Sequence, residues 1–439
     1  MSDVATYENM KDSGIKWIGS VPSHWRVYTL YQLVNQVKNK NSDLQEKNLL
    51  SLSYGKIKRK DIDSSDGLLP ASFDGYNIIE AGDIVLRLTD LQNDHTSLRV
   101  GLATERGIIT SAYTTLRPID IRNSKYLYYL IHAFDLKKGF YGMGSGVRQG
   151  LNYAEVKDLR VVLPSQDEQN AIIRFLDDQC NQIDTLVHET KKNIEDYKLW
   201  KASIIEETIT RGINPNAKTK KCDLEWISEI PHSWKTDRLK DLFVFGKGLP
   251  ITKENLVEQG VSVISYGQIH AKYNNGTSIT EPLLRYVPDT YVETNPESLV
   301  HEGDILVADT SEDVAGCGNC AYVDKEMMLF AGYHTIILRS IIGHDNKYLA
   351  YLFKTDAWRS QIRTRVSGVK LFSVSKKILN LATVILPPEE ERAEIVRFLD
   401  EKCDAIDSLI DSKQALLVDL ESYKRSLIYE VVTGKRKVV

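Results

Sequence analysis

The stretch LRVVLPSQDEQNAIIRFLDDQCNQIDTL at 159–186 is repeated later in the chain by a similar stretch, LATVILPPEEERAEIVRFLDEKCDAIDSL at 381–409. In both copies a short apolar run ends at proline, and acidic residues follow at once. Proline suits the first turn of a helix, and acidic side chains there meet the positive end of the helix dipole. The two stretches therefore predict strands at 159–163 and 381–386, each leading directly into a helix.

Apolar residues then recur at alternating steps of four and three. The first series is Leu176, Cys180, Ile183, Val187, Thr190, Ile194, Tyr197, Lys201, Ile204 and Thr208. The second is Leu399, Cys403, Ile406, Ile410, Lys413, Leu417, Leu420, Lys424, Leu427 and Val431. A 3.5-residue spacing kept over about 45 residues is typical of a coiled-coil seam, so we expect the two helices to pair antiparallel. The alternative is that each helix folds back on its own globular domain. The seam lysines are expected to extend to solvent or to meet acidic groups on helices of partner proteins.

The duplication covers nearly the whole chain. The matching pairs are KWIGSVPSHW (16–25) with EWISEIPHSW (225–234), GDIVLRLTD (82–90) with GDILVADTS (303–311), and SKYLYYLIH (124–132) with NKYLAYLFK (346–354). Between these anchors, 35–80 and 244–300 share almost no similarity. A period of roughly 220 residues is far longer than the repeats of a solenoid. Each half therefore has shared ends around a divergent interior.

Short runs that alternate apolar and polar residues predict further strands within each half. The expected strands are 83–89 and 107–117 in the first half and 304–310 and 333–339 in the second, with helices at 124–134 and 346–354. These patterns predict an α+β fold with two β-rich domains, separated by two long antiparallel helices and related by an internal pseudo-two-fold axis.

The composition is that of a soluble globular protein, with 42% hydrophobic and 26% charged residues among 439. No apolar run approaches the ~20 residues that span a bilayer, and the N-terminus lacks the features of a signal peptide. Five scattered cysteines fit the reducing cytoplasm better than a disulfide scaffold. The net charge is −4, so a nucleic-acid-binding surface would need to concentrate its basic residues locally.

Such a concentration occurs at 54–60, where Tyr54 and a glycine precede Lys56, Lys58, Arg59 and Lys60. Lysine and arginine contacts to phosphates supply affinity that does not depend on base sequence. We interpret this run as a DNA contact; the alternative is a solvated surface hairpin.

The second half repeats Ser-Tyr-Gly of 53–55 at 265–267, which we interpret as a further anchor of the duplication. The DNA-binding candidates that follow there are Tyr266, Gln268, His270, Lys272 and Tyr273.

A glycine-rich loop at 142–149 offers backbone N–H groups for phosphate. Ser145, Arg148 and Gln149 are the candidates in this loop, since arginine and glutamine can reach guanine and adenine edges. Ser367 and Lys370 occupy the matching loop of the second half. The alternative for both is an ordinary turn.

Arg87, Thr89 and Thr310 follow paired strands and are also expected to face the groove of DNA. Cys317 and Cys320 have C-x-x-C spacing, but no second ligand pair follows, so we interpret them as ordinary cysteines and expect no metal.

With these repeats, the chain resembles the specificity subunits of type I restriction–modification systems. The match rests on KDSGIKWIGSVPSHW at 11–25, on LPSQDEQNAIIRFLDDQCNQID at 163–184 and on their second copies. The family's junction is Leu-Pro followed by an acidic-Gln pair, here Glu168-Gln169. The second copy departs from it with Glu391-Arg392.

The resemblance implies a non-catalytic subunit without a cofactor that reads a bipartite double-stranded DNA site. Two adenine methyltransferase subunits, and restriction subunits, would dock on the helices and shared ends. The docking residues would be Trp17, Trp25, Glu168, Gln169, Trp226, Trp234, Glu391 and Arg392. The implied segments are recognition domains at 1–164 and 222–386, spacer helices at 165–211 and 387–434, a linker at 212–221 and a tail at 435–439.

Two alternatives to this interpretation are an enzyme and a protein-binding scaffold. An enzyme would need motifs that the sequence lacks. No Gly-x4-Gly-Lys-Ser/Thr loop for ATP is present. Asn295-Pro296-Glu297 lacks the second proline and the aromatic residue of a methyltransferase catalytic motif. A coiled-coil scaffold without sequence-specific DNA binding is the second alternative.

Overall fold

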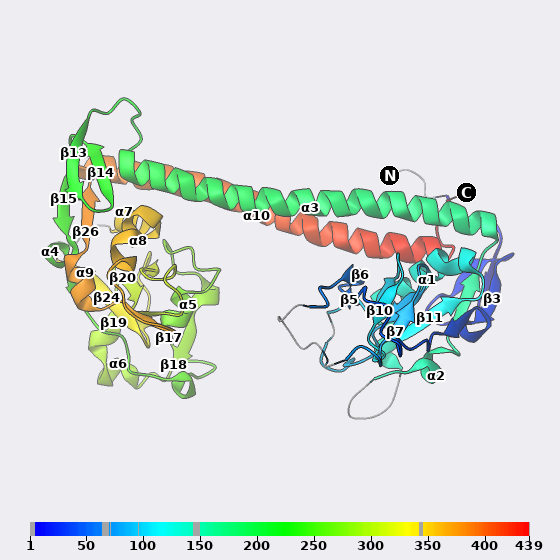
Figure 1. Cartoon of the computed structure of the whole chain (residues 1–439). Helices are drawn as coiled ribbons and strands as arrows, with labels where there is room; N and C mark the ends of the chain where they lie inside the picture. Colours follow the sequence, from blue (N-terminus) through cyan, green and yellow to red (C-terminus); the bar gives the residue numbers. More distant parts are fainter. Residues whose placement is uncertain are drawn as a thin grey trace. The chain divides into compact units, whose positions relative to one another are not determined.

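The computed structural model describes residues 5–63, 70, 72–94, 96–143, 150–341 and 346–438. The chain divides into two compact units (Figure 1). Unit 1 contains residues 1–191 and 414–439, and unit 2 contains residues 192–413. The units therefore cut across the linear segments expected from the sequence, because each long helix contributes one part to each unit.

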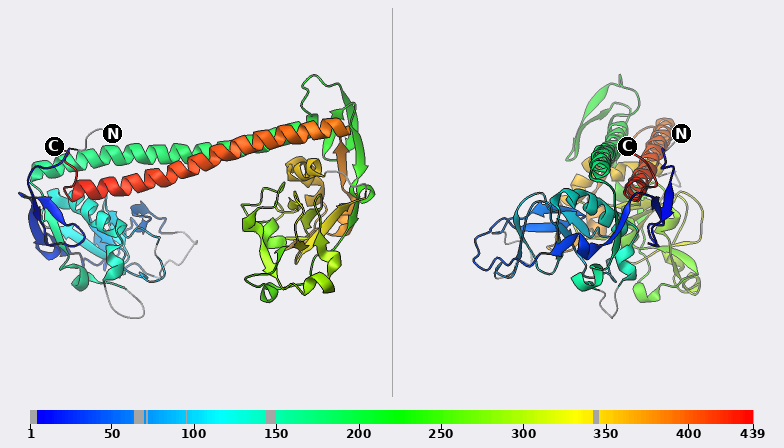
Figure 2. Two further views of the ribbon diagram at one scale, coloured as in Figure 1. Left: turned by 180° about the vertical axis from the view of Figure 1, so that it is seen from behind. Right: turned by 90° about the vertical axis from the view of Figure 1, so that its right-hand side faces the viewer.

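The long helices are α3 (Gln166–Arg211) and α10 (Glu389–Val432), which lie side by side in Figures 1 and 2. Every residue of both predicted seams is buried or half-buried. In unit 1, Lys424 Nζ lies 2.6 Å from Asp184 Oδ1, and in unit 2 Lys201 Nζ lies 2.6 Å from Asp407 Oδ2. Each pair joins a late turn of one helix to an early turn of the other, so the predicted antiparallel pairing is confirmed.

The same ion pairs correct one expectation. The acidic partners of two seam lysines come from the facing helix of this chain and not from helices of other proteins. Both lysines keep part of their surface exposed, because the long aliphatic stem packs on the seam while the ammonium group reaches its edge.

In unit 1 the central sheet is antiparallel with strand order β4-β11-β8-β9. Smaller antiparallel pairs are β1–β2, β3–β12, β5–β6 and β7–β10. The strands are β1 (Met10–Asp12), β2 (Ser20–Pro22), β3 (Arg26–Thr29), β4 (Val34–Gln36), β5 (Leu50–Ser53), β6 (Lys56–Arg59), β7 (Asn77–Ile79), β8 (Ile84–Leu86), β9 (Val100–Leu102), β10 (Gly107–Ile109), β11 (Thr114–Pro118) and β12 (Arg160–Leu163). The helices besides α3 are α1 (Ser124–Leu136) and α2 (Tyr153–Val156).

Unit 2 repeats this arrangement with a central sheet of order β16-β24-β20-β22, a β15–β26 pair and a second sheet of order β18-β17-β23-β19. Its strands are β13 (Thr219–Leu224), β14 (Ile227–Pro231), β15 (Lys235–Arg238), β16 (Phe243–Phe245), β17 (Val261–Ile264), β18 (Arg285–Val287), β19 (Leu299–Val300), β20 (Ile305–Ala308), β21 (Thr310–Ser311), β22 (Cys320–Tyr322), β23 (Leu329–Ala331), β24 (Thr335–Ser340), β25 (Phe372–Ser373) and β26 (Thr383–Leu386). Its short helices are α4 (Leu239–Leu242), α5 (Tyr266–Ile269), α6 (Tyr291–Thr294), α7 (Lys347–Lys354), α8 (Asp356–Arg363) and α9 (Lys376–Leu381).

The predicted α+β fold with two β-rich domains is thus confirmed, but two of the expected strands are interrupted, since 304–310 contains β20 and the start of β21. The expected strand at 107–117 is two strands, because residues 110–113 form a turn in which Tyr113 N donates to Thr110 O at 3.2 Å. Strand β10 then pairs with β7, while β11 joins the central sheet.

The core of unit 1 joins the globular part to both long helices. Trp25, Tyr126 and Leu176 are fully buried with Val431 near the end of α10. Described residues close to the two ends of the chain also meet here, since Lys437 N donates to Ala5 O at 2.7 Å (Figure 2).

Candidate nucleic-acid interface

The β5–β6 hairpin carries the basic run in unit 1. Tyr54 and Gly55 form its turn with φ of 47° and 75°, and Tyr54 is 79% exposed. Positive φ at both central residues gives the two-residue turn whose twist matches that of the flanking strands. Lys56, Lys58 and Lys60 are exposed and alternate along the chain, so they project from one face of the hairpin. The hairpin therefore presents three ammonium groups beside an exposed aromatic ring.

Arg59 differs from its neighbours because it is charge-balanced within the fold. Its Nε lies 2.9 Å and 2.8 Å from the two carboxylate oxygens of Glu105. The hydrogen bonds from Arg59 lower the pKa of Glu105. The positive charge that the hairpin offers to a phosphate therefore comes mainly from its lysines.

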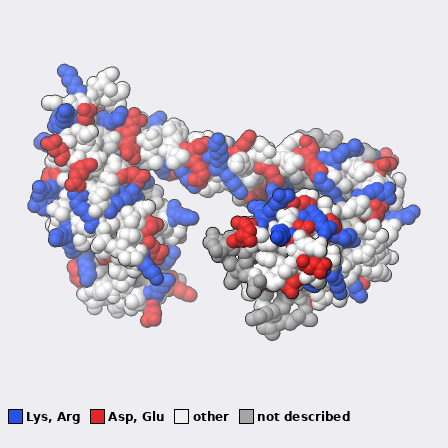
Figure 3. Space-filling view, viewed as in Figure 1, with Lys and Arg blue, Asp and Glu red and all other residues white. Residues whose placement is uncertain are grey.

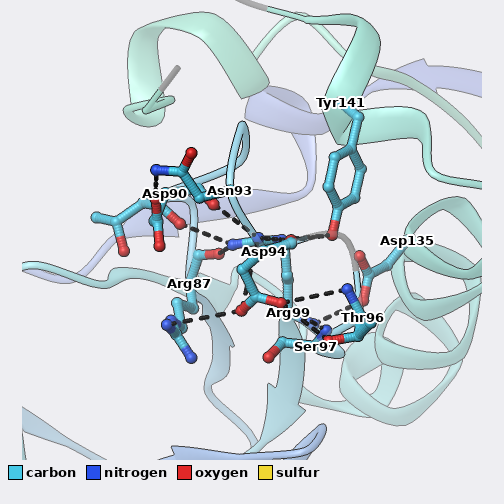
Figure 4. A network of polar contacts seen from close by, with 10 residues as sticks. Arg87, Asp90, Asn93, Asp94, Thr96, Ser97, Arg99, Asp135 and Tyr141 are labelled. Carbon is cyan, nitrogen blue, oxygen red and sulfur yellow. Dashed lines mark hydrogen bonds and ion pairs between the residues drawn. The ribbon is translucent and has the colours of Figure 1, made fainter. Parts of the chain in front are cut away.

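The loop that follows β8 is held from inside by Arg99, which is 0% exposed (Figure 4). Its guanidinium donates to the carbonyl oxygens of Arg87, Thr89, Asp90 and Asp94 and to the hydroxyl of Tyr141. The distances to Thr89 O and Tyr141 Oη are 2.7 Å and 2.9 Å. An arginine can be buried in this way only because its donors are paired with acceptors that the loop supplies.

Asp94 completes the network on the solvent side of Arg99. Its carboxylate accepts backbone hydrogen bonds from Ser97 at 2.9 Å and Thr96 at 3.2 Å, and it lies 3.8 Å from Arg87 Nη2. Hydrogen bonds from Ser97 hold the pKa of Asp94 well below its usual range. Arg87, which we expected to face DNA, is thus half-buried and turned toward Asp94, whereas Thr89 is exposed.

Unit 2 holds the corresponding loop with different side chains. His270 Nε2 lies 2.8 Å from Thr310 O, and its Nδ1 lies 2.9 Å from Asn319 Nδ2. A carbonyl oxygen only accepts, so Nε2 donates and Nδ1 accepts. Asn319 occupies the place of Arg99, because Ala308 N donates to Asn319 O as Arg87 N donates to Arg99 O. His270 and Thr310 therefore shape this loop from within.

The repeated Ser-Tyr-Gly phrase marks equivalent strand ends, as expected of an anchor of the duplication, but the segments that follow it differ. After β17, Tyr266 begins α5, and Gln268 Oε1 accepts from Ser265 N at 3.1 Å to close its first turn. The Tyr266 ring lies 5.5 Å from the ring of His334, whose φ is 56°. Tyr333 beside it is 42% exposed.

Other predicted residues of unit 2 lie at the surface. Lys272 and Tyr273 are exposed after α5, and Ser367 and Lys370 are exposed on the loop before β25. Val369 in that loop is 95% exposed. The candidates Ser145, Arg148 and Gln149 lie outside the described residues and stay predictions.

The structure brings the hairpin and the Arg99 loop of unit 1 together. A Cβ placed on Gly55 would lie 3.1 Å from Leu98 Cβ, directly before Arg99. One on Gly101 would collide with Leu52 of β5 and Ile57 of β6. The basic hairpin is therefore packed beside the buried arginine and the loop that it holds.

The predicted docking residues form a frame that fastens each helix start. Trp25 Nε1 donates to Glu168 Oε1 at 3.2 Å, and Trp234 Nε1 donates to Glu391 Oε1 at 3.0 Å. Both indoles are 0% exposed. They position the helices and have no surface to offer a partner directly.

The remaining docking residues are less uniform. Trp17 is half-buried, and its ring lies 5.1 Å from that of Phe134. Trp226 Nε1 donates to a threonine hydroxyl at 3.0 Å. Gln169 is 2% exposed, and its side-chain amide donates to the carbonyl oxygen of Pro164. Arg392 is half-buried and lines a groove of about 460 Å³.

Cys317 and Cys320 belong to the hydrophobic core of unit 2, whereas Cys222 is half-buried. Cys317 and Cys320 are buried, and burial raises the pKa of Cys320 to about 11. Across the part of the chain that the structure describes, no cluster of three or more His, Cys, Asp or Glu side chains is arranged for a metal. Nor does any helix within the described ranges have the length and apolarity to cross a membrane.

Comparison with known proteins agrees with this architecture. The family model for the type I restriction modification DNA specificity domain matches residues 22–196 and 231–418. The chain is 22% identical over 428 residues to the type I restriction enzyme MjaVIII specificity subunit of Methanocaldococcus jannaschii, covering 95% of this chain and 94% of that one. It is 25% identical over 459 residues to the putative MjaX specificity subunit of the same organism, covering 98% and 97%.

Two solved structures share the fold. One, described as the structural basis of complex assembly and conformational transition of the type I R-M system, matches with a TM-score of 0.68 at 15% identity, covering 94% of this chain and 98% of that one. The HsdS subunit from Thermoanaerobacter tengcongensis matches with a TM-score of 0.52 at 14% identity over 94% and 98%.

The chain therefore belongs to the type I restriction–modification DNA specificity family. It is a non-catalytic subunit that recognises DNA sequence.

Sequence reasoning missed Arg99 and Tyr141. A single arginine between Leu98 and Val100 was its only local signal, because a charged residue that opens an apolar strand needs internal partners.

Proposed function

We propose that the chain binds a bipartite, asymmetric double-stranded DNA site. Each recognition domain binds one half-site, and helices α3 and α10 fix the spacer between them. The observation that carries this proposal is a common frame with unlike loops. Thr89 O and Thr310 O occupy matching positions, yet a buried arginine holds the first and a histidine holds the second. Duplex DNA has local two-fold symmetry, so two readers built on one frame can bind half-sites about one turn, ~34 Å, apart.

The charge distribution supports localised rather than general attraction to DNA. Lys and Arg are interspersed with Asp and Glu on the visible face in Figure 3. The hairpin of unit 1 is an exception, since Lys56, Lys58 and Lys60 have no ion pair with any described residue. We assign phosphate binding in the first domain to these lysines.

Two adenine methyltransferase subunits dock, in this proposal, on the shared frame, and restriction subunits join the same assembly. Exposed apolar side chains recur at matching positions beside the seam. Leu186 and Tyr423 are 49% and 47% exposed in unit 1, and Leu409 and Trp200 are 43% and 49% exposed in unit 2. Each directly precedes a seam residue, so in an antiparallel pair they lie on the same side of the coiled coil. Apolar side chains left exposed on a charged helix suit a protein partner.

The test is selection of binding sites from a random duplex library by the full chain, alone and with its methyltransferase subunit. We expect enrichment of two short unlike sequences at a fixed separation. Binding without any enrichment in both conditions would favour the alternative, a coiled-coil scaffold that does not read DNA. Enrichment of one half-site only would contradict the bipartite proposal.

A further inference from the structure

The loop between β8 and β9 presents two side-chain amides at its tip. Gln92 and Asn93 are both exposed. Asn93 Nδ2 donates to Asp90 Oδ1 at 2.8 Å, and Asp90 has a φ of 57° (Figure 4). A side-chain amide offers two N–H donors beside a carbonyl acceptor, so Asn93 keeps one N–H free, and a donor with an acceptor matches the N7 and N6 positions of adenine in the major groove. An exposed carboxylate such as that of Asp90 can accept from cytosine N4.

The conformation of this loop is fixed by the burial of Arg99. Desolvating a guanidinium is costly unless its N–H groups are paired, and four of the acceptors are carbonyl oxygens of this one loop. Any other loop shape would leave the buried cation without partners. The left-handed residue Asp90 is sustained by the same contacts, since a non-glycine residue keeps such a φ only when its surroundings impose it. The tip is therefore preorganised.

The position of the loop suits base contacts. It adjoins the basic hairpin, because Leu98 packs against Gly55 in the hairpin turn. Lysines that bind phosphates would set the register of the domain on the duplex, and the neighbouring loop would then meet base edges. Its own carboxylates, Asp90 and Asp94, make the loop unsuited to phosphates.

The second repeat supplies an independent observation. Its loop after β20 is also pinned through the carbonyl of a threonine, although His270 makes the contact and the residues of the loop differ. The two domains thus both hold this loop in a defined conformation, although the side chains that the loop exposes differ between them.

We propose that Gln92 and Asn93 read base edges in the first half-site and that Arg99 is the positioning residue that holds them. This inference rests on the proposed function, because it assigns specificity within a domain that must first bind DNA. The chemistry it assigns is direct readout by amides, with adenine as the favoured base.

The test compares site selection by the full chain with that of Gln92→Ala and Asn93→Ala variants, each with the methyltransferase subunit present. We expect discrimination at one or two positions of one half-site to fall about 5- to 150-fold, the range for one good bidentate contact. The other half-site should be unchanged. Gln182→Ala, which removes an exposed amide from α3, is the matched control and should leave both half-sites unchanged.

Arg99→Lys tests the positioning role, since lysine keeps the charge but cannot satisfy the same set of carbonyls. We expect the same half-site to lose selectivity while the slope of affinity against salt stays as in the unaltered chain, because phosphate contacts are retained. Arg122→Lys alters an exposed arginine paired with Asp120 and should change neither quantity. If Arg99→Lys fails to fold, the amide variants alone decide the matter.

The outcomes separate the two proposals. If the unaltered chain selects a bipartite site and both amide variants keep full selectivity, the assignment of Gln92 and Asn93 is wrong while the proposed function stands. If the unaltered chain selects no sequence, both fail. Equal loss at both half-sites would also overturn the assignment.

Discussion

The hydroxyl of Tyr126 donates a hydrogen bond to the carbonyl oxygen of Val432, 306 positions later in the chain, at 3.0 Å. Unit 2 contains the same contact, in which Tyr348 donates to Ile209 O, also at 3.0 Å. Each tyrosine belongs to one repeat and its acceptor to the end of the other repeat's helix. The globular part of each repeat thus contacts the C-terminal end of the other repeat's long helix. The two repeats make this contact in the same way.

Removing these hydroxyls should destabilise the two units by similar amounts. In Tyr126→Phe or Tyr348→Phe a buried carbonyl loses its side-chain donor, and we expect a loss of about 1 kcal/mol in the free energy of unfolding for each. The two losses should add, because the sites share no residue. Urea unfolding followed by circular dichroism measures both. Tyr31→Phe, at an exposed tyrosine, is the control and should have no effect. Strongly unequal losses would contradict the equivalence of the two contacts.

The start of α3 depends on the carboxylate of Glu168. Burial alone would raise the pKa of Glu168, but hydrogen bonds from His24, Trp25 and Ser165 outweigh it and lower the pKa. Glu168→Ala leaves the buried Trp25 N–H without an acceptor, so we expect a loss of about 1–3 kcal/mol. Glu168→Gln keeps an acceptor oxygen and should recover much of this. Thermal unfolding of the unaltered chain, Glu168→Ala and Glu168→Gln gives the three melting temperatures. Equal melting temperatures would refute the role of this contact.

Neutralising the hairpin lysines should weaken DNA binding without changing sequence preference. The triple variant of Lys56, Lys58 and Lys60 to Gln should reduce the slope of log affinity against log salt by up to about 3, since each phosphate contact contributes about 0.9. Fluorescence anisotropy over a salt series measures the slope. The control replaces the exposed Lys11, Lys16 and Lys47 of the same unit and should leave the slope unchanged. An unaltered slope in the hairpin variant would place the phosphate contacts elsewhere.

His132 should make unit 1 sensitive to acid. Burial, with the charge of Lys424, lowers the pKa of His132 to about 4, against about 6.5 in an unfolded chain. Between these values the unfolded chain binds a proton that the folded chain does not, so stability falls as the pH drops through this window. From pH 7 to pH 5 the loss attributable to His132 should be about 2 kcal/mol.

The measurement is the difference in unfolding free energy between the unaltered chain and His132→Gln at the two pH values. Burial raises the pKa of Asp135 to about 6, which gives the opposite slope over a similar range. Because Asp135 is present in both proteins, its contribution cancels in the difference. Parallel pH profiles of the two proteins would show that His132 does not titrate in this way.

The long helices were predictable from the sequence because a 3.5-residue period leaves no other way to bury its apolar residues. The strands were placed less well, since local alternation does not show where a turn interrupts, as at Thr110 and Tyr113. The site was only partly predictable. The lysine run is visible as composition, but the contacts of Arg99 join residues as far apart as Arg87 and Tyr141. The Ser-Tyr-Gly repeat marked equivalent strand ends but did not reveal the different segments that follow, because the residues after it decide whether a hairpin or a helix forms.

The indole–carboxylate contact occurs in both repeats, between Trp25 and Glu168 and between Trp234 and Glu391. This duplication has a consequence for how the chain can diversify. The divergent interiors at 35–80 and 244–300 lie between the residues that make these contacts, so exchanging one interior for another would leave both contacts intact. If each interior reads one half-site, as proposed, such an exchange would change one half of the DNA target in a single step, without gradual mutation of a working protein.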